Sequence, residues 1–264
     1  MAKSRGGRSS SNRDYWNIGM IVVAVAALVF AGYAGVAALT RDGDSDYVSS
    51  YVAPSGSDST NPIAQGPRFG PITATDGRDA PVVAVFGDSY SEGTGATDPA
   101  ADGYTTLLAA DTGWDLRVTS LSGGGYRNPG VDGSGPYVRK IEAADLAAMK
   151  PDLIVIQGGL NDSGFGEETR TGAQRAITAA QAASPGTPIV VVGLLWGQGN
   201  LTEEAQRPYD SIEQAARAAE RVLFVPTEDL RFPLVADNVH PTTEGHRMIA
   251  ERIEQGLSAA GLSV

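Results

Sequence analysis

Ser89 is the first residue in this chain whose position is suited to nucleophilic catalysis. It follows the apolar run Val82–Phe86 in the tripeptide Gly-Asp-Ser. An apolar run that stops so abruptly predicts a buried strand that presents the serine hydroxyl at the carboxyl end of a sheet, where α/β folds build their sites. A serine hydroxyl is a poor nucleophile until a base removes its proton. Because Gly-Asp-Ser is a common tripeptide, the prediction depends on partners elsewhere in the chain.

A base for this serine is easy to select, because the chain has only two histidines. His246 falls within a predicted helix, where we expect a solvated or capping role. His240 follows Asp237 by three residues in the segment DNVHP, just after the last predicted strand. Across a turn, this offset lets the carboxylate bond the imidazole nitrogen that faces away from the serine, which fixes the tautomer and stabilises the imidazolium. A purely structural hydrogen bond is the alternative, and the strand-end serine disfavours it.

Acyl transfer also needs hydrogen-bond donors for the developing oxyanion, each typically worth about 3–4 kcal/mol. Asn161 lies in the segment GLND, just after a predicted strand, and can offer its side-chain amide there. Gly123 and Gly124 follow another predicted strand, and their backbone amides can approach a ligand without a Cβ in the way. Taken alone, both segments are ordinary turn sequences. Three strand ends and a final loop that all offer such groups favour one common site.

The elements that position these residues form an alternation of strands and helices from residue 81 onward. Short runs rich in Val and Ile, without alternation, predict strands covered on both faces. The predicted strands are Val82–Phe86, Leu116–Leu121, Leu153–Gln157, Ile189–Gly193 and Val222–Val225, and the predicted helices are Thr105–Asp111, Val138–Met149, Glu168–Ala183, Glu203–Arg221 and Thr243–Ala260. We expect an α/β fold, a three-layer α/β/α sandwich with a five-stranded parallel sheet.

Composition restricts the chemistry further. The chain carries 20 basic and 31 acidic residues, for a net charge of −11, which argues against nucleic acid as the main partner. It contains no cysteine, which excludes disulfides, thiolate metal sites and a cysteine nucleophile. A metal site built from Asp88, Asp237 and His240 is disfavoured because no compact ligand cluster is visible. We therefore expect no metal and no organic cofactor.

The N-terminal segment predicts a membrane anchor ahead of the folded domain. Residues 18–39 carry no charge and are long enough to cross the roughly 30 Å hydrocarbon layer as a helix. A basic tail, residues 1–17, precedes this span and acidic residues follow it, so the remainder is expected outside the cytoplasm. A cleaved signal peptide, and hence secretion, is the alternative. Residues 40–80 are rich in Ser, Asp, Gly and Pro and predict a flexible linker to a domain over 81–264.

Taken together, the motifs resemble those of the SGNH (GDSL-type) hydrolase superfamily, whose four blocks occur in the same order. The serine block reads FGDSY, the glycine block SGGGY, the asparagine block GLND and the histidine block DNVHP. The family often has an Asn shortly before its glycine, but here that segment reads VTSL, so Gly123 and Gly124 both remain candidates, with Gly123 preferred. The likeness covers residues 81–262, and the segment GYRNP looks like that of exported actinobacterial members.

The resemblance implies a role for each matching residue. Ser89 would be the nucleophile, His240 the base and Asp237 its partner. The oxyanion hole would consist of the Ser89 amide, a glycine amide and the Asn161 side chain. The fold implied is that of the flavodoxin-like SGNH hydrolases.

The function we expect is that of an exported, membrane-tethered serine esterase that hydrolyses a carboxylic ester, with a short acyl chain or an envelope glycan ester favoured. One alternative is a cell-envelope O-acyltransferase that uses the same site with a sugar hydroxyl as acceptor. Another is a non-catalytic envelope-binding module. Tyr90, Tyr126 and Trp196 are candidates for lining the substrate pocket, although packing is the simpler role for any one of them.

Overall fold

A computed structural model describes residue 64 and residues 66–262. Its centre is a parallel sheet of five strands in the order β2-β1-β3-β4-β5. The strands are β1 (Val82–Gly87), β2 (Asp115–Ser120), β3 (Leu153–Gln157), β4 (Ile189–Val192) and β5 (Val222–Val225). The predicted five-stranded parallel sheet is therefore confirmed, with strand ends that differ by one residue at most.

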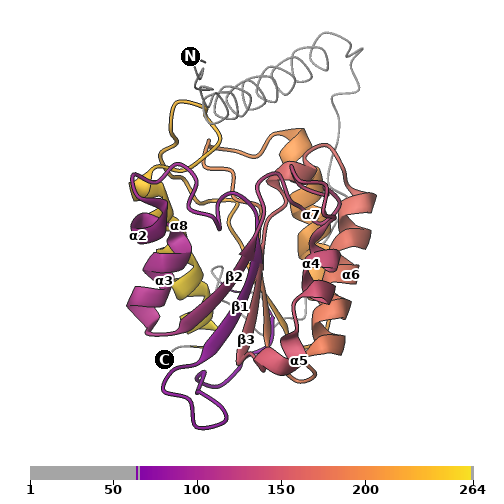
Figure 1. The fold of residues 1–264 in the computed structure, drawn as a ribbon. Helices are drawn as coiled ribbons and strands as arrows, with labels where there is room; N and C mark the ends of the chain where they lie inside the picture. The colour runs from indigo at the N-terminus through magenta and orange to yellow at the C-terminus, as the bar shows by residue number, and fades with distance from the viewer. Residues whose placement is uncertain (1–63, 65, 263–264) are drawn as a thin grey trace, which may run out of the picture. The chain divides into compact units, whose positions relative to one another are not determined.

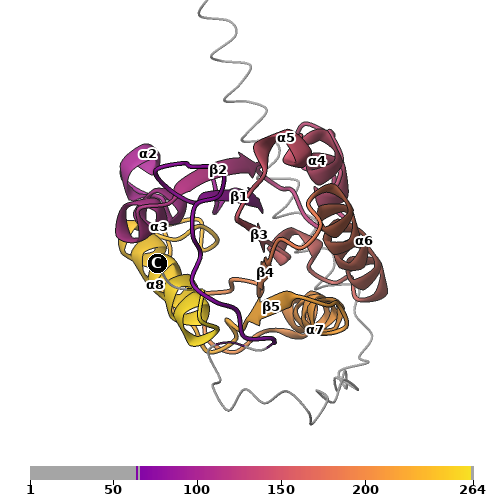
Figure 2. The ribbon, with the colours of Figure 1, turned by 90° about the horizontal axis from the view of Figure 1, so that it is seen from below.

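Helices cover both faces of the sheet, as Figures 1 and 2 show. One layer holds α2 (Pro99–Asp102), α3 (Tyr104–Thr112) and α8 (Thr243–Ala259). The other holds α4 (Tyr137–Ala143), α5 (Leu146–Met149), α6 (Glu167–Ala183) and α7 (Glu203–Arg217), and a 3-10 turn, η1 (Leu160–Asp162), follows β3. The three-layer α/β/α arrangement is the predicted one.

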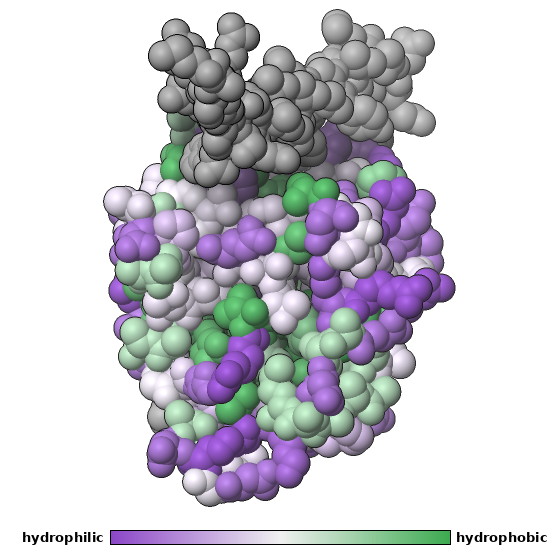
Figure 3. Space-filling view, viewed as in Figure 1, coloured by the Kyte–Doolittle hydropathy of each residue, from purple (hydrophilic) through white to green (hydrophobic). Residues whose placement is uncertain are grey.

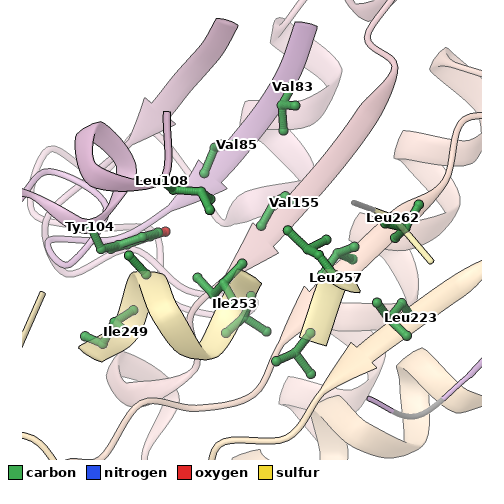
Figure 4. Close-up of a cluster of buried hydrophobic side chains, with 14 of the residues drawn as sticks. Val83, Val85, Tyr104, Leu108, Val155, Leu223, Ile249, Ile253, Leu257 and Leu262 are labelled. Carbon is green, nitrogen blue, oxygen red and sulfur yellow. The ribbon is translucent and has the colours of Figure 1, made fainter. Parts of the chain in front are cut away.

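The core consists of two clusters, one on each face of the sheet. Because successive side chains of a strand point to opposite faces, Val83 and Val85 of β1 enter one cluster while Ala84 and Phe86 enter the other. The first cluster packs on α3 and α8, and Figure 4 shows Ile253 of α8 among its members. The strands β1, β3, β4 and β5 are thus buried on both faces, which explains why their sequences are almost continuously apolar, whereas the edge strand β2 is partly exposed.

The predicted helix over Val138–Met149 is wrong, because the structure has two helices there. The backbone of Ala144 is extended (φ −79°, ψ 115°) and ends α4. Asp145 then caps α5, and its side chain accepts a hydrogen bond from the N–H of Ala148 (3.0 Å). An aspartate that bonds the backbone in this way favours a helix start over a helix interior.

The segment before β1 packs on the domain over the part that is described. Ala64 and Ile72 are buried in the α3–α8 cluster, and the N–H of Phe69 donates to the carbonyl oxygen of Ala260 (2.8 Å). Figure 2 shows this segment crossing beneath the sheet, at the end where the strands begin. Packing of the domain therefore starts before residue 81.

The predicted membrane-spanning helix over residues 18–39 lies outside the described residues. Within residues 64 and 66–262, none of the helices combines the length and the apolar character needed to cross a membrane.

Candidate active site

Ser89 lies directly beyond β1, at the carboxyl end of the sheet (the upper end in Figure 1). The loop that follows turns back at once, since the N–H of Thr94 donates to the carbonyl oxygen of Ser89 (3.0 Å). Gly87 is required for this turn, because a Cβ there would lie 1.9 Å from Ser91 Oγ. The serine is 7% exposed, so only a small part of its surface is open to a substrate.

His240 and Asp237 lie on the histidine loop (residues 234–241), which leads into α8. Asp237 Oδ1 accepts hydrogen bonds from the N–H groups of Val239 (2.8 Å) and His240 (2.9 Å), so the carboxylate closes its own turn. The loop is also closed by a hydrogen bond from the N–H of Val235 to the carbonyl oxygen of His240 (2.9 Å). Thr242 then caps α8 and fixes where the helix begins.

The structure brings Ser89, His240 and Asp237 together in one hydrogen-bonded chain. His240 Nε2 lies 3.0 Å from Ser89 Oγ, and His240 Nδ1 lies 2.7 Å from Asp237 Oδ2. One ring nitrogen thus faces the hydroxyl while the other faces the carboxylate. This is the geometry of a base oriented by an acid, able to take a proton from the serine.

The electrostatics of Asp237 suit an ionised partner for the imidazole. Partial burial of Asp237 acts to raise its pKa, but hydrogen bonds from the His240 side chain and from the backbone N–H groups of His240 and Val239 outweigh burial. The net result is a pKa below the usual value for aspartate. The carboxylate is therefore ionised at neutral pH and can stabilise a protonated His240.

The glycine candidates lie on the glycine loop (residues 121–136), which begins directly after β2. The N–H of Gly124 donates to the carbonyl oxygen of Leu121 (2.9 Å). The N–H of Gly123 has no acceptor among the described residues, and Gly123 adopts a φ of +72°. Asn161 Nδ2 donates to the carbonyl oxygen of Gly124 (2.8 Å), which leaves one of its two hydrogens for another acceptor. Among these groups, the Gly123 N–H and one hydrogen of Asn161 Nδ2 are thus free to donate to a substrate.

Asp162 holds the glycine loop and the Asn161 turn together. Its buried carboxylate accepts hydrogen bonds from the N–H groups of Tyr126 (2.8 Å), Arg127 (3.1 Å) and Asn128 (3.0 Å). Burial raises the pKa of Asp162, and the three N–H groups partly oppose that shift. These contacts give Asp162 a bracing role between the two segments.

Glu92 is a site residue that the sequence reasoning missed. Its carboxylate accepts from both the N–H (2.9 Å) and the hydroxyl (2.6 Å) of Ser122, the residue before Gly123. Glu92 lies on the loop that also carries Ser89, so this contact ties the proposed nucleophile to the glycine loop. No sequence signal identifies the contact, because it joins two loops 30 residues apart.

A buried polar network lies beneath Ser89. Asp88 is 1% exposed, and its Oδ1 accepts from the N–H of Tyr90 (3.0 Å). With its amide oriented to suit both neighbours, Gln157 donates to Ser91 Oγ (2.7 Å) and to Asp88 Oδ1 (3.2 Å). Burial raises the pKa of Asp88 to about 7, although the bonds from Tyr90 and Gln157 oppose the shift. Within the described residues, no group of three or more His, Asp or Glu is arranged to hold a metal ion.

The expectation of a solvated or capping His246 is wrong, because this residue is fully buried. Its Nδ1 accepts from the N–H of Tyr104 (3.3 Å), and its Nε2 lies 3.1 Å from the carbonyl oxygen of Thr94. Its ring stacks on that of Tyr104. Burial lowers the pKa of His246. The neutral ring therefore links α8 to the start of α3 at Tyr104 and to the loop after β1 at Thr94.

The three aromatic pocket candidates occupy different environments. Tyr90 is 2% exposed, and its hydroxyl donates to the carbonyl oxygen of Val239 (2.5 Å), so it supports the histidine loop from below. Tyr126 is 1% exposed and packs edge-on against Tyr137. Trp196 is half-buried and packs against the cluster beneath α6 and α7. Their role as pocket residues remains a prediction.

Comparison with known proteins agrees with this architecture. A family model described as the GDSL-like Lipase/Acylhydrolase family matches residues 85–248, more than half of the chain and all four motif blocks. GDSL lipase Rv0518 of Mycobacterium tuberculosis is 29% identical over 192 residues, which are 67% of this chain and 81% of that protein.

Two further comparisons show weaker similarity. An acetylxylan esterase of Xylanibacter ruminicola is 26% identical over 222 residues, covering 68% of this chain and 43% of that protein. The solved structure of salicylyl-acyltransferase SsfX3 from a tetracycline biosynthetic pathway has a TM-score of 0.53 at 21% identity, covering 70% of this chain and 56% of that one. The latter likeness concerns the fold alone. With the family match over the four blocks, the chain belongs to the GDSL-like lipase/acylhydrolase family of the SGNH hydrolase superfamily and is an ester-hydrolysing enzyme.

Proposed function

We propose that this protein is an exported, membrane-tethered serine esterase that hydrolyses short-chain or glycan-linked carboxylic esters. The observation that carries the proposal is the hydrogen-bonded chain from Ser89 Oγ to His240 Nε2 (3.0 Å) and from His240 Nδ1 to Asp237 Oδ2 (2.7 Å). The family match supports ester hydrolysis as the reaction class.

In the first half of the proposed reaction, Ser89 Oγ attacks the acyl carbon of the ester while its proton passes to His240 Nε2. The ionised Asp237 stabilises the imidazolium that results. A tetrahedral oxyanion forms, and its collapse breaks the ester bond. His240 donates its proton to the departing alcohol, which leaves an acyl group on Ser89.

Three donors are proposed to hold the oxyanion. They are the backbone N–H of Ser89, the backbone N–H of Gly123 and the side-chain amide of Asn161. The N–H of Gly124 is already engaged by Leu121, which supports Gly123 as the glycine of the set. Donors fixed by loop contacts before the reaction need no reorganisation as charge develops.

In the second half, water replaces the alcohol. His240 takes a proton from the water, which attacks the acyl carbon, and the same donors hold the second oxyanion. Its collapse returns the proton to Ser89 and releases the carboxylic acid. Every proton is accounted for by Ser89, His240, substrate and water.

The proposed substrate and location have separate support. An acetylxylan esterase among the relatives supports an acylated glycan as the class of substrate. The uncharged run over residues 18–39, with its basic flank, supports a membrane tether and an external domain. In this arrangement residues 1–17 form a cytoplasmic tail and residues 40–80 connect the span to the domain.

Ester hydrolysis by the full chain in detergent micelles tests the mechanism. We expect 4-nitrophenyl acetate and butyrate to be hydrolysed, and Ser89→Ala or His240→Ala to lower kcat at least about 1,000-fold. Ser258→Ala, an exposed substitution on α8, is the matched control and should retain wild-type activity. Wild-type rates in either site variant would refute the mechanism. If an added oligosaccharide accepted the acyl group in preference to water, the enzyme would be an acyltransferase with the same site.

Membrane attachment is tested separately in cell fractions. The full chain should remain with membranes after extraction at alkaline pH, and deletion of residues 1–39 should release an active enzyme. Recovery of the full chain in the soluble fraction would contradict the tether.

A further inference from the structure

Arg127 is an exposed arginine held beside the proposed oxyanion donors. Its backbone N–H donates to the buried carboxylate of Asp162 (3.1 Å), as does the N–H of Asn128 (3.0 Å). Asn128 Nδ2 in turn donates to the carbonyl oxygen of Asn161 (3.1 Å). The backbone of Arg127 is therefore fixed relative to the Asn161 turn, directly through Asp162 and also through the neighbouring Asn128.

The guanidinium of Arg127 is oriented by an aromatic ring. Its Cζ lies 3.7 Å from the centroid of the Phe165 ring, a distance at which the ring face attracts a cation. Phe165 belongs to the segment that follows Asn161, and its N–H donates to the carbonyl oxygen of Asp162 (3.0 Å). One acidic residue thus anchors the arginine through its carboxylate and the ring through its backbone.

The guanidinium is free to bind an anion. Across residues 64 and 66–262, no side-chain hydrogen bond or ion pair involves Arg127, whereas Arg117, Arg170 and Arg247 each pair with an acidic residue. The chain has 31 acidic residues, so the unpaired state does not reflect a shortage of acids. An arginine with one face on a ring keeps its edge N–H donors, which match the two oxygens of a carboxylate or phosphate.

A cavity borders Arg127 on the side of α4 and α6. Its volume is about 350 Å³, at the lower end of the roughly 300–1,000 Å³ typical of small-molecule sites. Its wall on α6 includes Glu168, Thr171 and Arg175, and Glu167, which pairs with Arg170, also lines it. Its charge is thus mixed, and Arg127 supplies the cation on the side of the glycine loop.

We propose that Arg127, stacked on Phe165, forms an anion subsite that selects esters carrying a carboxylate or phosphate group near the scissile bond. The inference rests on the proposed esterase function and deepens it by naming the class of substrate. It assigns Arg127 to substrate binding and leaves the bond-breaking steps to Ser89 and His240.

Matched ester pairs test this subsite on the full chain. In the first pair, mono-4-nitrophenyl glutarate is compared with neutral 4-nitrophenyl butyrate, and the carboxylate lies on the acyl side. In the second pair, 4-acetoxybenzoate is compared with its methyl ester, and the carboxylate lies on the alcohol side. In at least one pair, Arg127→Gln should lower kcat/KM for the anionic ester about tenfold, because a charge-assisted hydrogen bond is lost. The neutral partner should change less than about twofold. Added NaCl should reduce the wild-type preference, since salt screens an exposed charge.

Two variants and one competitor complete the design. Arg117→Gln removes the same charge from the exposed edge of β2 and should leave the preference unchanged, whereas Arg127→Lys should retain part of it. Inorganic phosphate that competes only with the anionic ester would show that the subsite also accepts phosphate. Unchanged preference in Arg127→Gln, with neutral esters still hydrolysed, would overturn the subsite alone. If no ester were hydrolysed and Ser89 were inert, the esterase function and the subsite would fall together.

Discussion

Ser89 and the donors around it are held by short contacts between loops. The segment after β1 carries both Ser89 and Glu92, and Glu92 accepts two hydrogen bonds from Ser122. Ser122 precedes Gly123, whose N–H is the proposed oxyanion donor. A single exposed carboxylate therefore sets the distance between the proposed nucleophile and one of the groups that would stabilise its transition state.

Glu92→Ala should lower kcat about tenfold and leave KM almost unchanged. The reason is that a displaced Gly123 N–H weakens binding of the transition state while the ground-state contacts persist. Glu92→Gln, which can still accept from the Ser122 N–H, should recover most of the rate. Steady-state kinetics on a neutral ester measures both values, and an unchanged kcat in Glu92→Ala would contradict this role.

Asp88 should make the stability of the protein depend on pH. Burial raises its folded pKa to about 7, above the unfolded value of 3.8, so the folded state binds a proton that the unfolded state has released. Stability from this group is complete below the unfolded pKa and is lost as pH rises toward about 7.

Asp88→Asn mimics the protonated carboxyl. Between about pH 5 and pH 8 the wild type should lose more than about 1 kcal/mol of unfolding free energy relative to this variant. Urea unfolding across the range provides the measurement. The unfolding free energy of Asp132→Asn, a substitution at an exposed position, should change with pH in parallel with that of the wild type. Parallel curves for Asp88→Asn would contradict the assignment.

At the scale of the elements, the site depends on loops from four strand ends and the start of α8. The register pairs Gly87 with Ser120 at the carboxyl ends of β1 and β2, so the loop bearing Ser89 and the glycine loop begin side by side. Asp162 then joins the glycine loop to the Asn161 turn through three backbone N–H groups.

Asp162→Ala should reduce both stability and activity. It would leave three backbone N–H groups without their acceptor, at an expected cost of about 2–4 kcal/mol in unfolding free energy. Asp79→Ala, at an exposed position before β1, is the control and should cost less than about 0.5 kcal/mol. Denaturant unfolding and ester kinetics measure the two effects, and wild-type stability in Asp162→Ala would contradict the bracing role.

The strands β1, β3, β4 and β5 were predictable because burial on both faces leaves an almost continuous apolar run. The break between α4 and α5 could not be predicted, because the apolar residues on either side continue the helical period past Asp145. His246 was misjudged for a related reason. The helical periodicity of α8 shows which face of the helix is apolar. It does not show that Tyr104 and Thr94 come close enough to bond both ring nitrogens of His246.

The site residues that could be predicted are those that stand in short motifs. Asp237 and His240 bond within one turn, and Ser89 and Asn161 lie in the segments that begin at the ends of β1 and β3. Glu92, Gln157 and Arg127 escaped prediction as site residues because their partners come from distant segments or from backbone groups. A contact between loops is a property of the assembled sheet, and no local pattern records it.

At the scale of the whole molecule, hydrophobic surface is distributed unevenly. Figure 3 shows hydrophobic residues at the middle of the face seen in Figure 1, near the edge of the sheet, with hydrophilic residues around them. Val118 of the edge strand β2 is 40% exposed. At the opposite end of the sheet from the site, the segment before β1 packs under the strands and joins the core.

Ile72→Ala should destabilise the protein by about 2–4 kcal/mol, because Ile72 is buried in the α3–α8 cluster. Thr73→Ala, at the exposed neighbouring position, should have little effect. Chemical denaturation compares the two variants with the wild type. Equal stability of all three proteins would mean that this segment is a solvated tether as the composition predicts.

Ser89 is proposed to be a nucleophile that His240 activates. Reaction of the full chain with an alkyl fluorophosphonate, followed by peptide mass spectrometry, tests it most directly. We predict one phosphonyl adduct, on Ser89, formed rapidly in the wild type and at least about 100-fold more slowly in His240→Ala. Absence of an adduct, an adduct on another residue, or equal rates in the two proteins would contradict the claim.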